Sequence, residues 1–139
     1  MFCAYCIITV GTDMQLIITY ESGEPIYEQI KKQIRGMILS GDLIEGAMLP
    51  SIRTLAKEIS VGIITAKRAY DDLCNEGFCY SLQGKGIFVA SVNKEMAEGY
   101  AVKELRAKVK EIKSFAVQNS VNINIIKQIF KEEMGDMTK

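Results

Sequence analysis

Two helix patterns in the middle of this chain are separated by a linker of only three residues. Apolar residues at helical spacing predict a short helix from Ser51 to Ile59 and a longer one from Ile63 to Asn75. The break between them is Ser60-Val61-Gly62, and Gly62 can act as the N-cap of the second helix. Two helices joined by so tight a turn are typical of a helix-turn-helix.

Two strand-like runs follow the second helix, at residues 78–82 and 87–90. Between them lies Gln83-Gly84-Lys85-Gly86, whose glycines permit the positive φ angles of a tight hairpin. Helix, turn, helix and hairpin, in this order, predict a winged helix-turn-helix, which places its second helix in the major groove of DNA. The Gly-Lys-Gly turn is too short to be a nucleotide-binding phosphate loop.

A third helix is expected upstream, because isoleucines recur there every four residues and form one apolar face. Pro25 can begin this helix and Gly41 can end it, after a β-like run from Leu16 to Tyr20. The four isoleucines are Ile26, Ile30, Ile34 and Ile38. We therefore expect residues 14–91 to form one DNA-binding domain in an α+β, mostly helical chain.

Residues 1–13 are expected to be either an upstream, non-native translation start or a loose extension, since sequence typical of a folded domain begins at Met14. The segment lacks the positively charged region and the small-residue cleavage site of a signal peptide. The alternative is an extra strand that uses Ile7, Ile8 and Val10 and pairs with the run from Leu16 to Tyr20.

The second helix of the motif separates into a core face and an outward face when its residues are placed at 100° intervals. Ile64 and Arg68 point outward in the first two turns, flanked by Thr65 and Lys67, and acidic residues follow. A helix that meets DNA with its N-terminal half has this polarity, because carboxylates must stay away from phosphates. Ile64 has two interpretations, a hinge contact with the neighbouring helix or an apolar contact with a thymine methyl. The core face is formed by Ala66, Ala69, Tyr70 and Leu73.

Basic residues are concentrated in the motif, although the chain has no net charge and a pI near 6.3. The segment from 51 to 70 contains Arg53, Lys57, Lys67 and Arg68 against the single acid Glu58. A locally basic surface on a neutral protein suits a specific binder of DNA with modest nonspecific affinity.

The chain has four cysteines and no histidine, and this composition argues against a metal site and against most enzyme active sites. Without a secretion signal we expect reduced thiols in the cytoplasm. Cys3-x-x-Cys6 has metal-pair spacing, but a closed zinc site would also need Cys74 and Cys79, so no metal site and no cofactor is predicted. No histidine, clustered carboxylate pair or phosphate loop points to an enzyme. No apolar run is long enough to span a membrane.

Residues 92–139 change character and predict two further helices. The first carries a 3-4-3-4 apolar seam, typical of a coiled coil, and neither helix could bury its stripe alone. The alternatives are an intrachain α-hairpin and a dimer interface, and we favour the dimer because the segment is too small for a separate core. The expected interface residues are Val102, Leu105, Val109, Ile112, Ile126 and Phe130.

At this point the chain resembles a known family. The segments PIYEQIKKQIRGMILSGDL, LPSIRTLAKEI, AKRAYDDLCNEG and QGKGIFVA resemble the N-terminal domain of GntR-type bacterial transcription regulators, over roughly residues 16–90. The two-helix tail resembles the YtrA subgroup, since the chain has no room for the larger effector-binding domain of other subgroups. The resemblance implies DNA contacts by Arg53, by Thr65, Lys67 and Arg68, and by Gly84 at the tip of the wing.

Two positions depart from the family pattern. Gly62 stands where the family usually has Ser or Asn, which removes one side-chain phosphate contact, and Ile52 or Thr54 stands where it usually has Glu, which weakens the helix cap. The basic contacts remain. The full predicted DNA-binding set is Ser51, Arg53, Thr54, Ile64, Thr65, Lys67, Arg68, Gln83, Gly84, Lys85 and Gly86.

The predicted function is a sequence-specific transcription regulator, a cytoplasmic homodimeric repressor that binds an inverted-repeat operator of double-stranded DNA. One alternative is a thiol- or metal-responsive regulator that uses the N-terminal cysteines. Another is a winged helix that serves only as a protein-interaction module. Such a module would not need Arg53, Lys67 and Arg68 together on its outward face.

Overall fold

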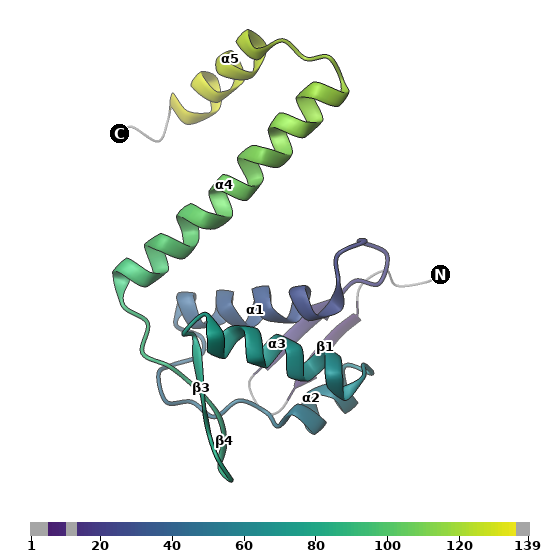
Figure 1. Ribbon diagram of the computed structural model, residues 1–139, viewed down its shortest axis with the longest axis vertical. Coiled ribbons are helices and arrows are strands. Elements are labelled where there is room, and N and C mark those ends of the chain that lie inside the picture. Colours follow the sequence, from purple (N-terminus) through teal and green to yellow (C-terminus); the bar gives the residue numbers. More distant parts are fainter. Residues whose placement is uncertain (1–5, 11–13, 136–139) are drawn as a thin grey trace. The chain divides into compact units, whose positions relative to one another are not determined.

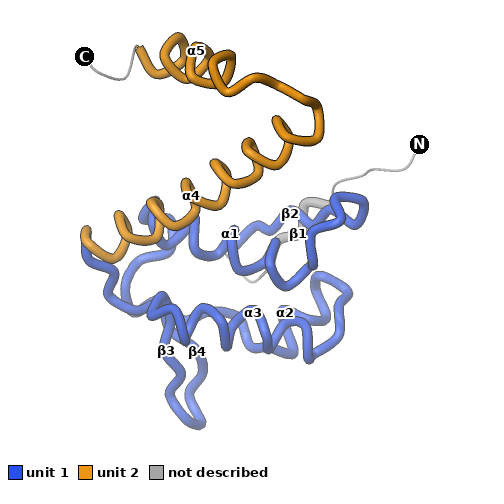
Figure 2. The backbone as a smooth tube through the Cα atoms, turned by 45° about the horizontal axis from the view of Figure 1, so that its top comes forward, with its two compact units in different colours: residues 1–93 blue, residues 94–139 orange. Residues whose placement is uncertain are grey.

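The computed structural model describes residues 6–10 and 14–135. The chain divides into two compact units, residues 1–93 and 94–139 (Figure 2). In chain order the elements are β1 (Cys6–Val10), β2 (Met14–Ile18), α1 (Ile26–Ser40), α2 (Ile52–Glu58), α3 (Ile63–Asn75), β3 (Cys79–Leu82), β4 (Gly86–Val89), α4 (Lys94–Gln118) and α5 (Ile123–Met134).

The described part of the first unit contains three helices and two small antiparallel sheets, with α3 packed against both α1 and α2 (Figure 1). The isoleucine face of α1 lies in the core, where Ile30 and Ile34 are fully buried. Gly41 ends α1 with φ 86° and donates its N–H to the Ile38 carbonyl, as its position after the helix predicts. The other fully buried large side chains are Leu16, Ile18, Leu55, Ile59, Tyr70, Leu73, Phe78 and Val89.

The expected N-terminal extension contains a strand. β1 pairs antiparallel with β2, Cys6 opposite Ile18 and Val10 opposite Met14, which corresponds to the extra-strand alternative. Residues 1–5 and 11–13 of the expected extension lie outside the described residues. The β-like run predicted at residues 16–20 is displaced by two residues, because β2 covers 14–18.

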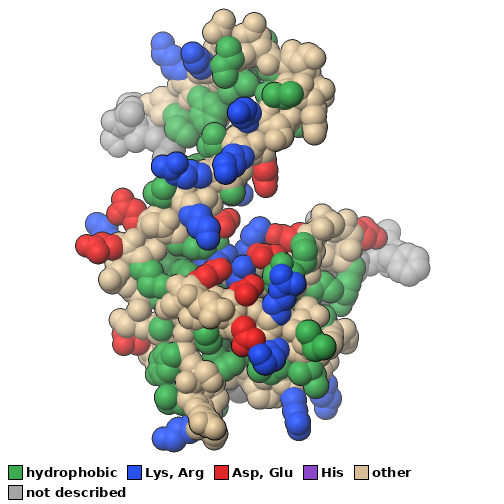
Figure 3. Space-filling view, viewed as in Figure 1, with side chains coloured by type: hydrophobic (Ala, Val, Ile, Leu, Met, Phe, Trp, Pro, Cys, Tyr) green, Lys and Arg blue, Asp and Glu red, His purple; other side chains and the backbone are tan. Residues whose placement is uncertain are grey.

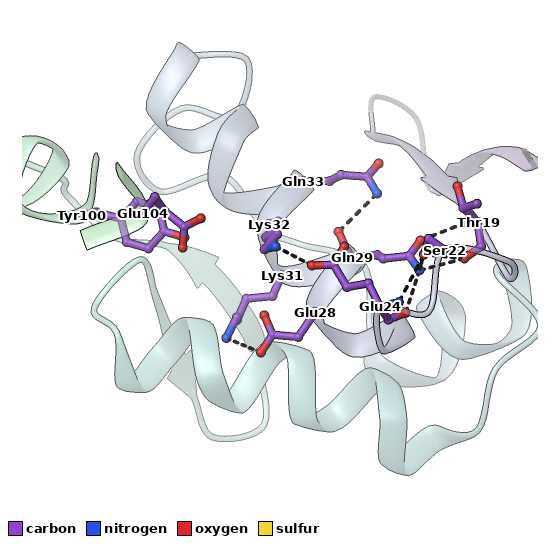
Figure 4. A network of polar contacts seen from close by, with 10 residues as sticks. All are labelled: Thr19, Ser22, Glu24, Glu28, Gln29, Lys31, Lys32, Gln33, Tyr100 and Glu104. Atoms are coloured by element: carbon purple, nitrogen blue, oxygen red, sulfur yellow. Dashed lines mark hydrogen bonds and ion pairs between the residues drawn. The ribbon is translucent and has the colours of Figure 1, made fainter. Parts of the chain in front are cut away.

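Two glutamines of α1 bond to the backbone at and just beyond the end of β2. The Gln33 amide accepts from the N–H of Ile17 and donates to its carbonyl, both at 2.7 Å. The Gln29 amide does the same with Thr19, both at 2.8 Å, and also donates to Ser22 and to the Glu24 carbonyl in the loop before α1 (Figure 4). The backbone beyond Ile18 therefore bonds to α1, and Gln29 is buried to 6 % exposure by this role.

The wing is the hairpin of β3 and β4, with Cys79 opposite Val89 and Leu82 opposite Gly86. The segment before α2 runs along β4, where Leu49 donates to the Ile87 carbonyl and Val89 donates to the Ala47 carbonyl. The structure starts β3 one residue later and β4 one residue earlier than predicted. Phe78 falls outside β3 because its N–H bonds to the Leu73 carbonyl at the end of α3.

The second unit is a pair of helices, α4 and α5. Ser120 takes a left-handed φ of 54° after α4, and Val121 then donates to the Ala116 carbonyl. The Asn122 side chain caps α5 by accepting the Asn124 N–H at 2.8 Å. Among the described residues no helix, α4 included, is both long enough and apolar enough to cross a membrane.

Candidate nucleic-acid interface

The first helix of the motif begins at a side-chain cap. The Ser51 hydroxyl accepts the Thr54 N–H at 3.1 Å and lies 2.8 Å from the Thr54 hydroxyl. This half of a capping box is what the sequence predicts, because Thr54 cannot return a carboxylate to the Ser51 N–H. Both cap residues and Arg53 are exposed at this end of α2.

The turn between the two helices is tight because one residue takes an unusual conformation. Ser60 has φ 55°, in the left-handed region, and this allows Val61 to donate to the Ala56 carbonyl at 2.9 Å. Gly62 then takes an extended conformation at the N-cap of α3, with no side-chain hydrogen bond. The turn therefore ends α2 and starts α3 within four residues.

The two faces of α3 separate as the periodicity predicts. Its core face is completely buried and consists of Ala66, Ala69, Tyr70 and Leu73. The buried Tyr70 hydroxyl donates to the Pro50 carbonyl at 2.8 Å, which ties α3 to the residue before α2. Ile64 is 83 % exposed, which is the opposite of a hinge contact with a neighbouring helix. The contact of Ile64 with a thymine methyl stays a prediction.

The two cations of α3 have different partners. The Lys67 ammonium lies 2.5 Å from the Asp71 carboxylate, one turn further along the same helix. The Arg68 guanidinium lies over the ring of Tyr27 in α1, with Cζ 3.8 Å from the ring centroid. Arg68 is exposed as predicted, but its side chain leans toward α1 rather than extending straight outward. Thr65 is half-buried between the core and the surface.

A network of charges joins the C-terminal half of α3 to α1. The Lys31 ammonium lies 3.1 Å from Glu28, 3.6 Å from Asp72 and 3.3 Å from Glu76. Burial lowers the pKa of Lys31, but its hydrogen bond to Glu28 and the charges of Glu76 and Glu28 outweigh burial, so the pKa is raised. The network fixes α3 on α1, which sets the direction in which the outward face of α3 points.

Arg35 extends this network into the core. Its guanidinium lies 2.5 Å from the Glu76 carboxylate and over the Phe78 ring at 5.7 Å, and Arg35 is 2 % exposed. A charge this deeply buried is stable only when paired, so Glu76 and Arg35 act as a unit.

The tip of the wing is fully accessible. Gln83, Gly84, Lys85 and Gly86 are all exposed, and Lys85 donates its N–H to the Leu82 carbonyl to close the turn. Gly84 and Gly86 have φ angles of 75° and 129°, which L side chains rarely adopt. Figure 3 shows basic side chains at the lower end of the first unit, at the tip of the hairpin and beyond α2, with acidic side chains higher up.

Cys74 and Cys79 are poor sensors. Burial, with the nearby Cys74, raises the pKa of the Cys79 thiol to about 12, and burial also raises the pKa of Cys74. Thiols with raised pKa values stay protonated and react slowly. Within residues 6–10 and 14–135, no group of His, Cys, Asp and Glu is arranged to hold a metal ion. Cys3 lies outside the described residues.

Comparison with known proteins now adds to this geometry. The family model of bacterial regulatory proteins of the gntR family matches residues 26–89. The transcriptional repressor YtrA of Bacillus subtilis is 29 % identical over 84 % of this chain and 89 % of its own length. YtrA from Sulfolobus acidocaldarius, a solved GntR-family transcription factor, is 33 % identical with a TM-score of 0.52, over 73 % of this chain and 99 % of that one.

This chain belongs to the GntR family. It is a DNA-binding transcription regulator with the winged helix-turn-helix and C-terminal helices predicted from sequence. The repressor NagR of Bacillus subtilis is 38 % identical over 80 residues, but the chain spans only 33 % of that relative's length. As a transcription regulator of the GntR family, the protein is non-enzymatic.

Sequence reasoning missed two residues of this surface. One is Asp71, which was not in the predicted set although its place four residues after Lys67 is a standard signal for a helical ion pair. The other is Tyr27, whose contact with Arg68 depends on how α1 and α3 pack. No local pattern reports that packing.

Proposed function

We propose that this GntR-family protein is a homodimeric repressor that binds an inverted-repeat operator through α3 and the wing. The observation that carries the proposal is the contrast between the two faces of α3. One face is fully buried, and the other presents Ile64, Lys67 and Arg68 in its first two turns. Docking by the N-terminal half of this helix fits the major-groove geometry of helix-turn-helix proteins.

Ile64 and Lys67 are the proposed base-reading side chains. The β-branched side chain of Ile64 suits the methyl group of thymine, and the Lys67 ammonium suits the O6 and N7 acceptors of guanine. The Lys67–Asp71 pair is exposed, at 59 % and 53 % of the two side chains, so it is worth little in water and exchanges readily for a DNA partner.

Residues at the ends of elements are the proposed phosphate and minor-groove contacts. Ser51, Arg53 and Thr54 lie at the start of α2, where a helix N-terminus favours an anion. At the wing, Gly84 allows the backbone to approach the minor groove closely while Lys85 supplies charge. Gln83 and Gly86 complete this tip.

The proposed dimer uses the second unit. Val102, Leu105 and Val109 are 45 %, 54 % and 44 % exposed along a surface formed by α4 alone. Ile112, Ile126 and Phe130 instead line an apolar groove between α4 and α5 of one chain. We infer that a second copy covers the α4 surface and adds to the groove, so two DNA-binding units are linked for two half-sites. The repressor names of YtrA and NagR support the direction of regulation.

The test is a selection of bound duplexes from a random library of about 30 base pairs, which holds two half-sites a helical turn apart. The full-length protein should enrich an inverted repeat and should bind it in anisotropy titrations at least about 10³-fold more tightly than random duplex. Enrichment of a single half-site would contradict the dimer. Enrichment of nothing would contradict sequence-specific binding and favour the protein-interaction module.

A further inference from the structure

The ring of Tyr27 lies directly against a cation of the DNA-facing helix. Arg68 Cζ is 3.8 Å from the ring centroid, well inside the limit of about 6 Å for a cation–π contact. Tyr27 lies in the first turn of α1 and is half-buried, whereas Arg68 lies on the exposed side of α3. One helix therefore supplies the aromatic support and another supplies the charge.

The contact decides on which side of α3 the guanidinium lies. Asp72, one turn beyond Arg68, pairs with Lys31 of α1, which marks the flank of α3 that faces α1. Ile64, one turn before Arg68, marks the outward face. Arg68 lies between them, and Tyr27 draws its guanidinium toward the α1 flank.

We propose that Tyr27 is a positioning residue that holds Arg68 at the α1 flank of α3, where the guanidinium binds a backbone phosphate at the edge of the major groove. The inference rests on the proposed DNA binding. A helix in the major groove has bases in front of its outward face and phosphates beside its flanks. A guanidinium stacked on a ring by its face keeps its N–H edge available for a bidentate bond to phosphate.

The stacking also lowers the cost of binding. A long arginine side chain loses rotamer freedom when it is fixed on a ligand, and a contact made before binding removes part of that loss. Tyr27 is thus expected to affect affinity without adding charge. Because every duplex carries phosphates, the effect should be the same for any DNA sequence.

The experiment is a double-mutant cycle with Tyr27→Leu and Arg68→Met, using the selected duplex and a random duplex of the same length. Arg68→Met should weaken binding about tenfold on both probes and reduce the salt slope by about one. Tyr27→Leu should weaken binding about 2–5-fold on both probes with the salt slope unchanged. The double variant should bind like Arg68→Met alone, since Tyr27 acts only through Arg68.

Two further variants test the chemistry of the contact. Tyr27→Phe keeps the ring and should bind like the unaltered protein. Arg68→Lys keeps the charge but loses the planar face, so it should lose as much affinity as Tyr27→Leu. It also replaces that variant if thermal unfolding shows that Tyr27→Leu does not fold.

Several results would overturn the inference. A Tyr27→Leu loss that persists beside Arg68→Met would mean that Tyr27 acts by itself, and losses confined to the selected duplex would mean that Arg68 reads a base. An unchanged Arg68→Met variant would remove Arg68 from the DNA surface and overturn this inference alone. Unaltered protein that binds neither probe would overturn the proposed function as well.

Discussion

Lys67 and Arg68 are neighbours in sequence, yet each is held by a different kind of partner. Lys67 forms an exposed ion pair within α3, and Arg68 stacks on α1. The ion pair competes directly with DNA for the ammonium, whereas the stacked ring does not compete for the guanidinium N–H groups. Asp71 should therefore lower the affinity of the protein for DNA.

We expect Asp71→Asn to raise affinity for random duplex about threefold, since an exposed pair is lost and one carboxylate leaves the phosphate side. Anisotropy titrations at fixed salt would measure this change. Asp42→Asn, in the loop after α1, makes the same change in net charge and is the control. An equal gain in both variants would show that net charge alone is responsible.

The protein should lose stability in alkaline solution, because three of its buried groups have raised pKa values. Burial raises the pKa of Cys79 to about 12 and also raises that of Tyr70, while Lys31 is raised by its hydrogen bond and carboxylates against the effect of burial. In each case the folded protein holds its proton more tightly than the unfolded chain does. Their contributions are complete below the ordinary pKa values of 9.0, 10.0 and 10.5 and are lost as the pH rises above them.

Urea unfolding should therefore give a constant free energy near neutral pH and a falling one above about pH 9. Cys79→Ala removes the thiol contribution and should make the decline shallower between about pH 9 and pH 10. A decline of the same steepness in this variant would assign the effect to Cys74, Tyr70 and Lys31.

At the scale of elements, α3 is held on α1 by charge as well as by apolar packing. Glu76 receives both Arg35 and Lys31, and Arg35 is 2 % exposed. We expect Glu76→Gln to lower the free energy of unfolding by roughly 2 kcal/mol, because a buried guanidinium loses its carboxylate. Urea unfolding would measure this, with the exposed loop residue Glu45→Gln as the control. Equal values for the two variants would show that the network contributes nothing.

The limits of α3 could be predicted from sequence because its signals are local. The break at residues 60–62 and the apolar spacing define the helix from Ile63 to Asn75, which the structure reproduces. The β-branched run of residues 7–10 indicates a strand, but its pairing with β2 could be stated only as an alternative, because no local signal fixes which strand it pairs with. The direction of Arg68 could not be predicted, since Tyr27 lies on a different helix and reaches it only through folding.

At the scale of the whole molecule, the exposed α4 surface predicts the oligomeric state. Val102→Asp together with Leu105→Asp should give a monomer, since each places a carboxylate where an apolar partner is expected. Sedimentation equilibrium would measure the mass, and operator affinity should fall because two linked units no longer act together. Ala107→Asp, on the opposite side of α4, is the control. An intact dimer in the double variant would show that this α4 surface is not the dimer interface.

Gln29 and Gln33 of α1 should protect the protein from aggregation at high concentration. The edge strands of a sheet present unpaired N–H and carbonyl groups. These groups can pair with a strand of another molecule, which leads to aggregation. Gln29 and Gln33 occupy those groups on Ile17 and Thr19 by donating and accepting at once. A carboxylate can only accept, so Gln33→Glu should reopen that edge, and light scattering of concentrated protein should then increase with time.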